Sequence, residues 1–112
     1  MNRQDGYFEH ERLEVYRLAV EFLGWTQTLD MKGRAWLKNQ LERAAGSVVL
    51  NLGEGAHQWS RGAKRRHYRI ALASCGESAT ALDAAEALGV RGVAAGRPLN
   101  GRIARMLNGL AR

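Results

Sequence analysis

The segment QLERAAGSVVLNLGEG, residues 40–55, decides the fold that the sequence predicts. Its apolar side chains recur three and four residues apart, the spacing that makes them neighbours on the surface of an α-helix. They cover much of that surface and comprise Leu41, Ala44, Ala45, Val48, Val49 and Leu52. We therefore predict an amphipathic helix that packs against other helices in a core.

A polar line runs along the same helix. Ser47, Asn51 and Glu54 are spaced four and three residues apart, so they lie on one face of it. A buried amide or carboxylate without a partner costs about a few kcal/mol, so we expect a second helix to bring matching groups. Ser74 and Glu77 are the candidates. We predict that the five residues form a structural polar network that sets the register of two helices.

The order Gln-Leu-x-x-Ala-x-x-Ser-Val-x-x-Asn-Leu-x-Glu-Gly in residues 40–55 resembles the signature of a small bacterial family linked to 23S rRNA intervening sequences. Residues 13–19, LEVYRLA, resemble the first helix of that four-helix-bundle family, residues 70–77, IALASCGE, its third, and residues 103–110 its last. The resemblance implies an assembly, commonly a five-fold ring. In retroelement-associated relatives it also implies binding to nucleic acid and to a reverse transcriptase.

Helical periodicity and helix-end signals divide the chain into four helices, at about residues 9–29, 34–56, 61–88 and 98–111. Ser60 can cap the start of the third helix, Gly89 can end it, and Pro98 suits the first turn of the fourth. No segment alternates as a strand would. We predict an all-α, up-down four-helix bundle that forms a single domain over residues 1–112.

The first of these helices carries apolar residues on two opposite sides. One stripe comprises Leu13, Tyr16, Val20 and Leu23, and the other comprises Val15, Leu18, Phe22, Trp25 and Leu29. Because a small bundle has room for one such stripe, we predict that the second is a contact between subunits of a homo-oligomer. The alternative is that a wide arc of this helix faces the core of its own chain.

Positive charge is concentrated in the second half of the chain, which has a net charge of +6 overall. Residues 1–54 hold seven Lys or Arg against eight Asp or Glu, whereas residues 55–112 hold ten against three. Fourteen of the seventeen cations are Arg, whose planar guanidinium pairs with phosphate oxygens through two hydrogen bonds. This composition favours a phosphate-bearing partner.

The strongest functional signal is the acid-free span between Glu54 and Glu77. It contains Arg61, Lys64, Arg65, Arg66 and Arg69, and Trp59 lies beside this cluster, two residues before Arg61. Cations at the start of a helix add to the partial positive charge of its N-terminus, which an anion would offset. We therefore predict a nucleic-acid-binding segment in which Trp59 stacks on an unpaired base. The alternative is a solvated basic face that aids solubility.

Motifs for catalysis and for cofactors are lacking. There is no glycine-rich phosphate loop with its lysine, and His10, His57 and His67 lack the spacing of metal ligands, so we expect no metal and no cofactor. A hydrolase that uses Glu54 and Glu77 as paired carboxylates is a minor alternative, because their neighbours Ser47, Asn51 and Ser74 suit a structural network better. We expect a protein that is not an enzyme.

The expected compartment is the cytoplasm. The single cysteine, Cys75, excludes an internal disulfide, and we expect it to be a small buried residue. We expect no membrane insertion, because the sequence has no apolar run of spanning length and no leader peptide.

These features together predict a non-enzymatic oligomeric scaffold that holds RNA or DNA through its phosphates. A partner enzyme such as a reverse transcriptase is what the resemblance implies. The rival hypothesis is a protein–protein interaction module with incidental charge and no nucleic acid.

Overall fold

The structure, a computed structural model, describes residues 8–112, and within them every regular element is a helix. The part of the predicted domain at residues 1–7 lies outside the described residues. The elements are the 3-10 helix η2 (Glu9–Arg12), α1 (Glu14–Thr26), α2 (Ala35–Ala56), α3 (Arg61–Ala87), the 3-10 helix η3 (Val93–Gly96) and α4 (Arg97–Leu110).

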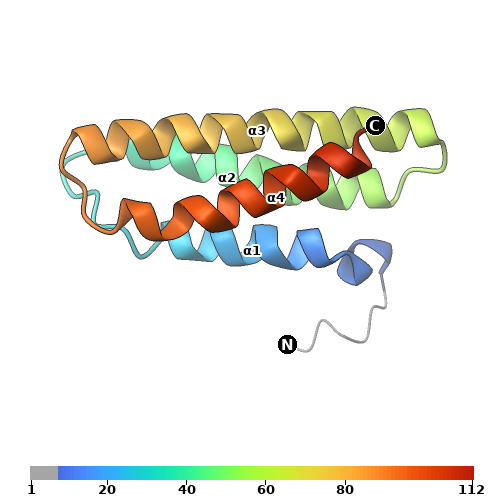
Figure 1. Cartoon of the computed structure of the whole chain (residues 1–112), viewed down its shortest axis with the longest axis horizontal. Coiled ribbons are helices and arrows are strands. Elements are labelled where there is room, and N and C mark those ends of the chain that lie inside the picture. The colour runs from blue at the N-terminus through green and yellow to red at the C-terminus, as the bar shows by residue number, and fades with distance from the viewer. Residues whose placement is uncertain (1–7) are drawn as a thin grey trace.

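Successive α-helices run in opposite directions along a common axis (Figure 1). Each packs against its neighbours around the bundle, α1 on α2, α2 on α3, α3 on α4 and α4 on α1, and the α2–α3 contact is the most extensive. The prediction of an all-α, up-down four-helix bundle is confirmed.

The core takes large side chains from all four α-helices. The most deeply buried include Phe22, Leu37, Leu41, Leu52, Leu82, Ile103 and Leu107. Burying one such side chain stabilises the fold by about 1.5 to 3 kcal/mol. In the segment of residues 40–55, Leu41, Val48 and Leu52 are buried, so this stretch supplies much of the core, as its periodicity predicts.

The helix-end signals are also confirmed. Ser60 caps α3, because its hydroxyl oxygen accepts a hydrogen bond from the backbone N–H of Ala63 at 3.1 Å. Gly89 follows the C-terminus of α3 with a φ of +84°, a conformation that favours glycine. Pro98 lies in the first turn of α4.

The first predicted helix, residues 9–29, is wrong at both ends. Leu13 has extended backbone angles (φ −80°, ψ 120°) and separates η2 from α1. At the other end, the hydroxyls of Thr26 and Thr28 donate to the backbone carbonyls of Leu23 and Trp25. Such local bonds compete with helix continuation, and α1 ends at Thr26 rather than at Leu29.

The assignment of the stripe Val15, Leu18, Phe22, Trp25 and Leu29 to a subunit contact is wrong. Val15, Phe22 and Leu29 are buried in the core of their own chain, and Leu18 and Trp25 are half-buried against it. The opposite stripe also contributes, since Leu13, Tyr16 and Leu23 pack on the same core. The reason is that α1 contacts both α2 and α4, while η2 and η3 cover its sides, so a wide arc of it is enclosed.

The Trp25 ring lies against the backbone of Gly96, where η3 passes into α4. A methyl group at residue 96 would overlap this ring, although the backbone of Gly96 (φ −90°) would accept alanine. Gly96→Ala should therefore lower the free energy of unfolding by about 1 to 3 kcal/mol, the usual cost of overpacking.

Gly101→Ala in the same region is the matched control. A methyl group there would meet only the Arg105 guanidinium at 3.6 Å, an ordinary contact. Alanine inside a helix should leave stability unchanged or raise it by up to about 1 kcal/mol. Urea unfolding of the two variants measures the difference, and equal stabilities would show that Trp25 does not lie on Gly96.

Candidate nucleic-acid interface

The connection between α2 and α3 is a tight corner. Gly55, in the last turn of α2, is buried, and a methyl group there would lie 2.6 Å from the Tyr68 ring. Glycine therefore allows α3 to approach the end of α2 closely. The same packing buries Tyr68, and this burial raises the pKa of its hydroxyl.

Lys64 holds the corner together. Its ammonium group donates to the backbone carbonyls of Gly55 at 3.3 Å and of Ala56 at 2.9 Å, the last carbonyls of α2. A cation at the C-terminus of a helix is favourable, because those carbonyls carry partial negative charge. Lys64 was predicted to bind nucleic acid, but its ammonium is engaged in the fold of the corner.

The four arginines of the segment are placed differently. Arg61, Arg66 and Arg69 are exposed and Arg65 is half-buried. Within residues 8–112, none of the four guanidinium groups makes a hydrogen bond or an ion pair. The first turn of α3 contains no acidic residue. This end of α3 therefore presents positive charge that no acid of residues 8–112 neutralises.

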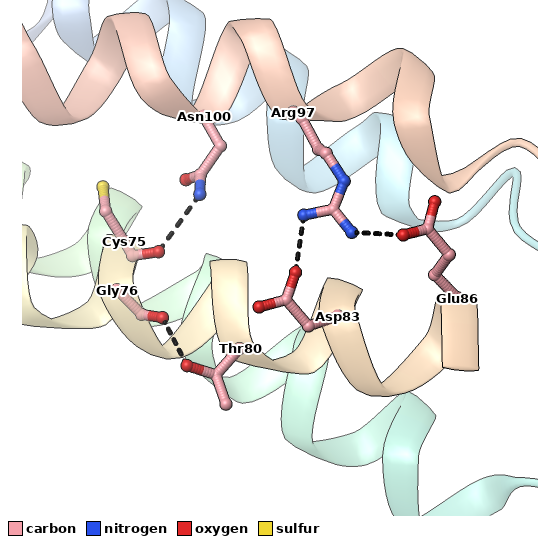
Figure 2. A network of polar contacts seen from close by, with 7 residues as sticks. All are labelled: Cys75, Gly76, Thr80, Asp83, Glu86, Arg97 and Asn100. Atoms are coloured by element: carbon pink, nitrogen blue, oxygen red, sulfur yellow. Dashed lines mark hydrogen bonds and ion pairs between the residues drawn. The ribbon is translucent and has the colours of Figure 1, made fainter. Parts of the chain in front are cut away.

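Other arginines of the basic half are neutralised. Arg97 donates to Asp83 at 2.7 Å and to Glu86 at 3.2 Å, as Figure 2 shows. The hydrogen bond to Asp83 and the charge of Glu86 raise the pKa of Arg97. Arg102 pairs with Glu14 at 2.9 Å. Both arginines belong to the basic excess of residues 55–112, and these ion pairs neutralise them.

The register in which α4 packs along α3 places further positive charge near the start of α3. Helix α4 runs antiparallel to α3, and the Asn100 amide donates to the Cys75 carbonyl at 3.1 Å (Figure 2). Residues of α4 beyond Asn100 therefore lie beside the first half of α3. They include the exposed Arg105, and residues 87–112 contain no acid.

The predicted polar network is partly assembled. The Ser74 hydroxyl of α3 donates to the Ser47 hydroxyl of α2 at 2.8 Å. The Asn51 amide donates to the backbone carbonyl of Ser47 at 3.0 Å and lies 3.1 Å from its hydroxyl. The side chains of Glu54 and Glu77 are exposed, and their carboxylates make no hydrogen bond within the described chain, so their assignment to the network is wrong.

His67 completes this network in place of the glutamates. Its Nδ1 lies 3.2 Å from the side-chain oxygen of Asn51. Because the Asn51 nitrogen must donate to the Ser47 carbonyl, its oxygen is the acceptor and His67 Nδ1 carries the hydrogen. His67 precedes Ser74 by seven residues, two helical turns, so the sequence held a signal that placed both on one side of α3.

A second histidine contact also joins distant parts of the chain. His10 Nδ1 lies 2.8 Å from His57 Nε2, and the His10 ring also packs edge-on against Tyr16. Both histidines line a pocket of about 320 Å³ together with Glu54. No group of three or more His, Cys, Asp or Glu in residues 8–112 could hold a metal ion.

Glu54 and Glu77 do not share a cleft. Glu54 lines the histidine pocket at the end of α2, whereas Glu77 lines two pockets in the groove between α2 and α3. Ser47 and Ser74 line one of these groove pockets. The paired-carboxylate arrangement that a hydrolase would need is therefore not formed by these residues.

Cys75 is a buried free thiol, as the sequence predicts. Burial raises its pKa to about 11, so the thiol is protonated and unreactive at neutral pH. None of the helices in the described part of the chain is long and apolar enough to cross a membrane.

Comparison with known families assigns the chain. A family model described as 23S rRNA-intervening sequence protein matches residues 11–111. The chain belongs to this family. The match runs from η2 to the end of α4, so the whole bundle, with its α2–α3 corner and arginine segment, lies within the 23S rRNA-intervening sequence protein region. A comparison with curated proteins gives no match.

Replacing Asn51 by leucine tests the network. The substitution should lower the free energy of unfolding by about 1 to 3 kcal/mol, because Ser47 and His67 lose their shared partner. Glu54→Gln, one turn further along α2, is the control and should change it by less than about 0.5 kcal/mol. Urea denaturation gives both values, and an Asn51→Leu variant as stable as the control would rule the network out.

Proposed function

We propose that this chain is a non-enzymatic scaffold that binds the phosphates of RNA or DNA through Arg61, Arg65, Arg66 and Arg69. The observation that carries the proposal is that these four guanidinium groups lie at the N-terminal end of α3 without an acidic partner in residues 8–112. The name of the family, which associates its members with intervening sequences of 23S rRNA, also supports a nucleic-acid partner.

The positive charge at the start of α3 is unfavourable for two reasons. Arg61 lies in the first turn of α3, where an exposed cation is unfavourable by about 0.3 to 1 kcal/mol. Arg65 and Arg69 lie beyond that turn, and each adds repulsion with the like charge one turn before it. A bound phosphate would offset both terms and accept two hydrogen bonds from one guanidinium. A surface that served solubility alone would gain nothing from collecting the cations at this unfavourable position.

The arginines provide contacts to the phosphate backbone and no evident means of reading bases. Arg61, Arg65 and Arg69 follow one another at intervals of four residues, so they form a row along one side of α3. A row of this kind suits a backbone that carries regularly spaced negative charges. We therefore propose binding with little base specificity.

We also propose that the chain self-associates through contacts between its own copies. The form of the assembly would be the five-fold ring that the family resemblance implies. The contact would lie on the outer side of α2 and α3, where Trp36 and Ile70 are 60% and 42% exposed. Between them runs a groove whose two pockets share Gln40 and Glu77. Burying these apolar side chains against a second copy would stabilise a ring and repeat the arginine row around it.

A reverse transcriptase or another partner protein would then bind to this scaffold. A cytoplasmic location is part of the proposal, because the buried Cys75 is a free thiol that a reducing compartment preserves. The rival function is a protein–protein interaction module without nucleic acid, which would use the same α2–α3 groove but not the arginine row.

Replacing Arg61, Arg65 and Arg69 together by alanine should weaken binding to single-stranded RNA and to duplex DNA. Each phosphate contact contributes about 0.7 to 0.9 to the slope of log affinity against log salt concentration. Loss of three contacts should therefore reduce that slope by about 2 to 3. Fluorescence anisotropy titrations across a salt series measure affinity and slope together.

The matched control replaces Lys32, Lys38 and Arg91, three exposed cations outside the arginine row and outside the α2–α3 groove, by alanine. It changes the net charge equally, so it separates a local site from the long-range field. Equal slopes for the two triple variants would refute the placement of the site. If the unmodified protein binds neither polymer at low salt, the interaction module without nucleic acid takes the place of this function.

The proposed self-association predicts that Trp36→Glu combined with Ile70→Glu yields smaller species, because a charge desolvated at a subunit contact costs several kcal/mol. Leu110→Glu, at an apolar side chain of α4 that is 38% exposed, should leave the assembly intact. Light scattering at micromolar concentration makes the comparison. An unmodified protein that scatters only as a 12.4 kDa species would contradict the proposal.

A further inference from the structure

Trp59, in the loop between α2 and α3, is 100% exposed. An indole that packs on its own chain would remove a large apolar area from water, and this one forgoes that gain completely. Of the large apolar residues in the described chain, the next most exposed are Leu50 at 70% and Trp36 at 60%. Trp59 therefore contributes nothing by burial to the fold.

The position of Trp59 directly before the helix cap makes this exposure more informative. An apolar residue that precedes the cap usually packs against the fourth residue of the helix. That residue is Lys64, and its ammonium is bonded to the last carbonyls of α2. Lys64 therefore binds the end of α2 and does not pack on Trp59, and the indole is exposed to solvent.

The loop that carries Trp59 is nevertheless held in place. His57 N–H and Gln58 N–H donate to the last turn of α2, at 3.3 Å and 3.2 Å. On the other side of Trp59, the Ser60 hydroxyl caps α3. Anchors on both sides reduce the entropy that the loop would lose when a ligand orders it.

The exposed indole is also next to the arginine row. Arg61 follows it by two residues, and no acid intervenes before Glu77. The first two turns of α3 expose no other large apolar side chain, since Ile70 is the next one. A flat aromatic surface beside unpaired guanidinium groups matches a ligand that has flat apolar faces and negative charges along one backbone. A lipid surface would find only one apolar anchor here.

We propose that Trp59 is a base-stacking platform that makes the arginine row a site for single-stranded nucleic acid. This inference rests on the proposed function and adds the class of ligand. In a duplex the faces of the bases are covered by their neighbours, so an indole at the rim reaches only phosphate and sugar. In a single strand a base can stack on the indole while the adjacent phosphates contact the arginines.

The test uses the full chain and fluorescein-labelled oligonucleotides of about 12 nucleotides, single-stranded RNA and the corresponding duplex, within the range of known site sizes. Trp59→Ala should lower affinity for the single strand by about 5- to 150-fold, the range that loss of one base–aromatic stack produces. Affinity for the duplex should not change. The salt slope should also stay the same for both, because no phosphate contact is lost.

Two variants sharpen the comparison. Trp59→Phe retains a flat ring and should recover part of the lost single-strand affinity. Leu88→Ala removes an exposed apolar side chain at the opposite end of α3, outside the proposed contacts, and should leave single-strand binding intact.

An unchanged single-strand affinity in Trp59→Ala, or an equal loss for single strand and duplex, overturns the inference and leaves phosphate binding in place. Loss of lipid-vesicle binding in Trp59→Ala, without loss of RNA binding, overturns it in favour of a membrane surface. If the unmodified protein binds neither oligonucleotide at low salt, the proposed function fails first.

Discussion

The close approach of α2 and α3 at Gly55 is the constraint on which the rest of the molecule depends. A residue without a side chain lets Tyr68 lie against the end of α2, and the Lys64 ammonium donates to the last two carbonyls of this helix, which carry partial negative charge. These contacts fix the angle and the length of the corner. The start of α3 is therefore held close to the end of α2. The loop between the two helices exposes Trp59 to solvent.

The distribution of charge follows from the same arrangement. Lys64 is used at the C-terminus of α2, and Arg34 donates to the carbonyl of Leu88 at the C-terminus of α3. At the other end of α3, Arg97 forms ion pairs with Asp83 and Glu86 in the last turns of that helix. The guanidinium groups at the start of α3 have no ion pair within residues 8–112, so positive charge is concentrated at this end of the helix. This separation is what makes a phosphate partner the simplest interpretation.

Residue spacing and helix-end signals predicted the features of the structure that depend on neighbouring residues alone. Spacing and end signals located the four helices, and Ser60 behaves as the cap that its position predicts. Periodicity could not show how many neighbours enclose a helix, so the Phe22 stripe was assigned outward although α1 is enclosed by α2 and α4. Periodicity also showed which residues share one face of α2, but it could not show which residues of α3 lie opposite them. Glu54 and Glu77 were therefore assigned to a network that contains His67 instead. The contact of His10 with a residue 47 positions away required the tertiary fold.

The central claim is that nucleic acid binds where the fold leaves its positive charge, at the α2–α3 corner. Amide hydrogen exchange with and without a single-stranded RNA oligonucleotide tests it most directly, because it locates the ligand without any substitution. RNA bound at this corner should slow exchange in residues 57–69, which form the loop and the start of α3, and should cause little change at the opposite end of the bundle. Slowed exchange confined to the α2–α3 groove near Trp36, or no change anywhere at saturating RNA, would contradict it.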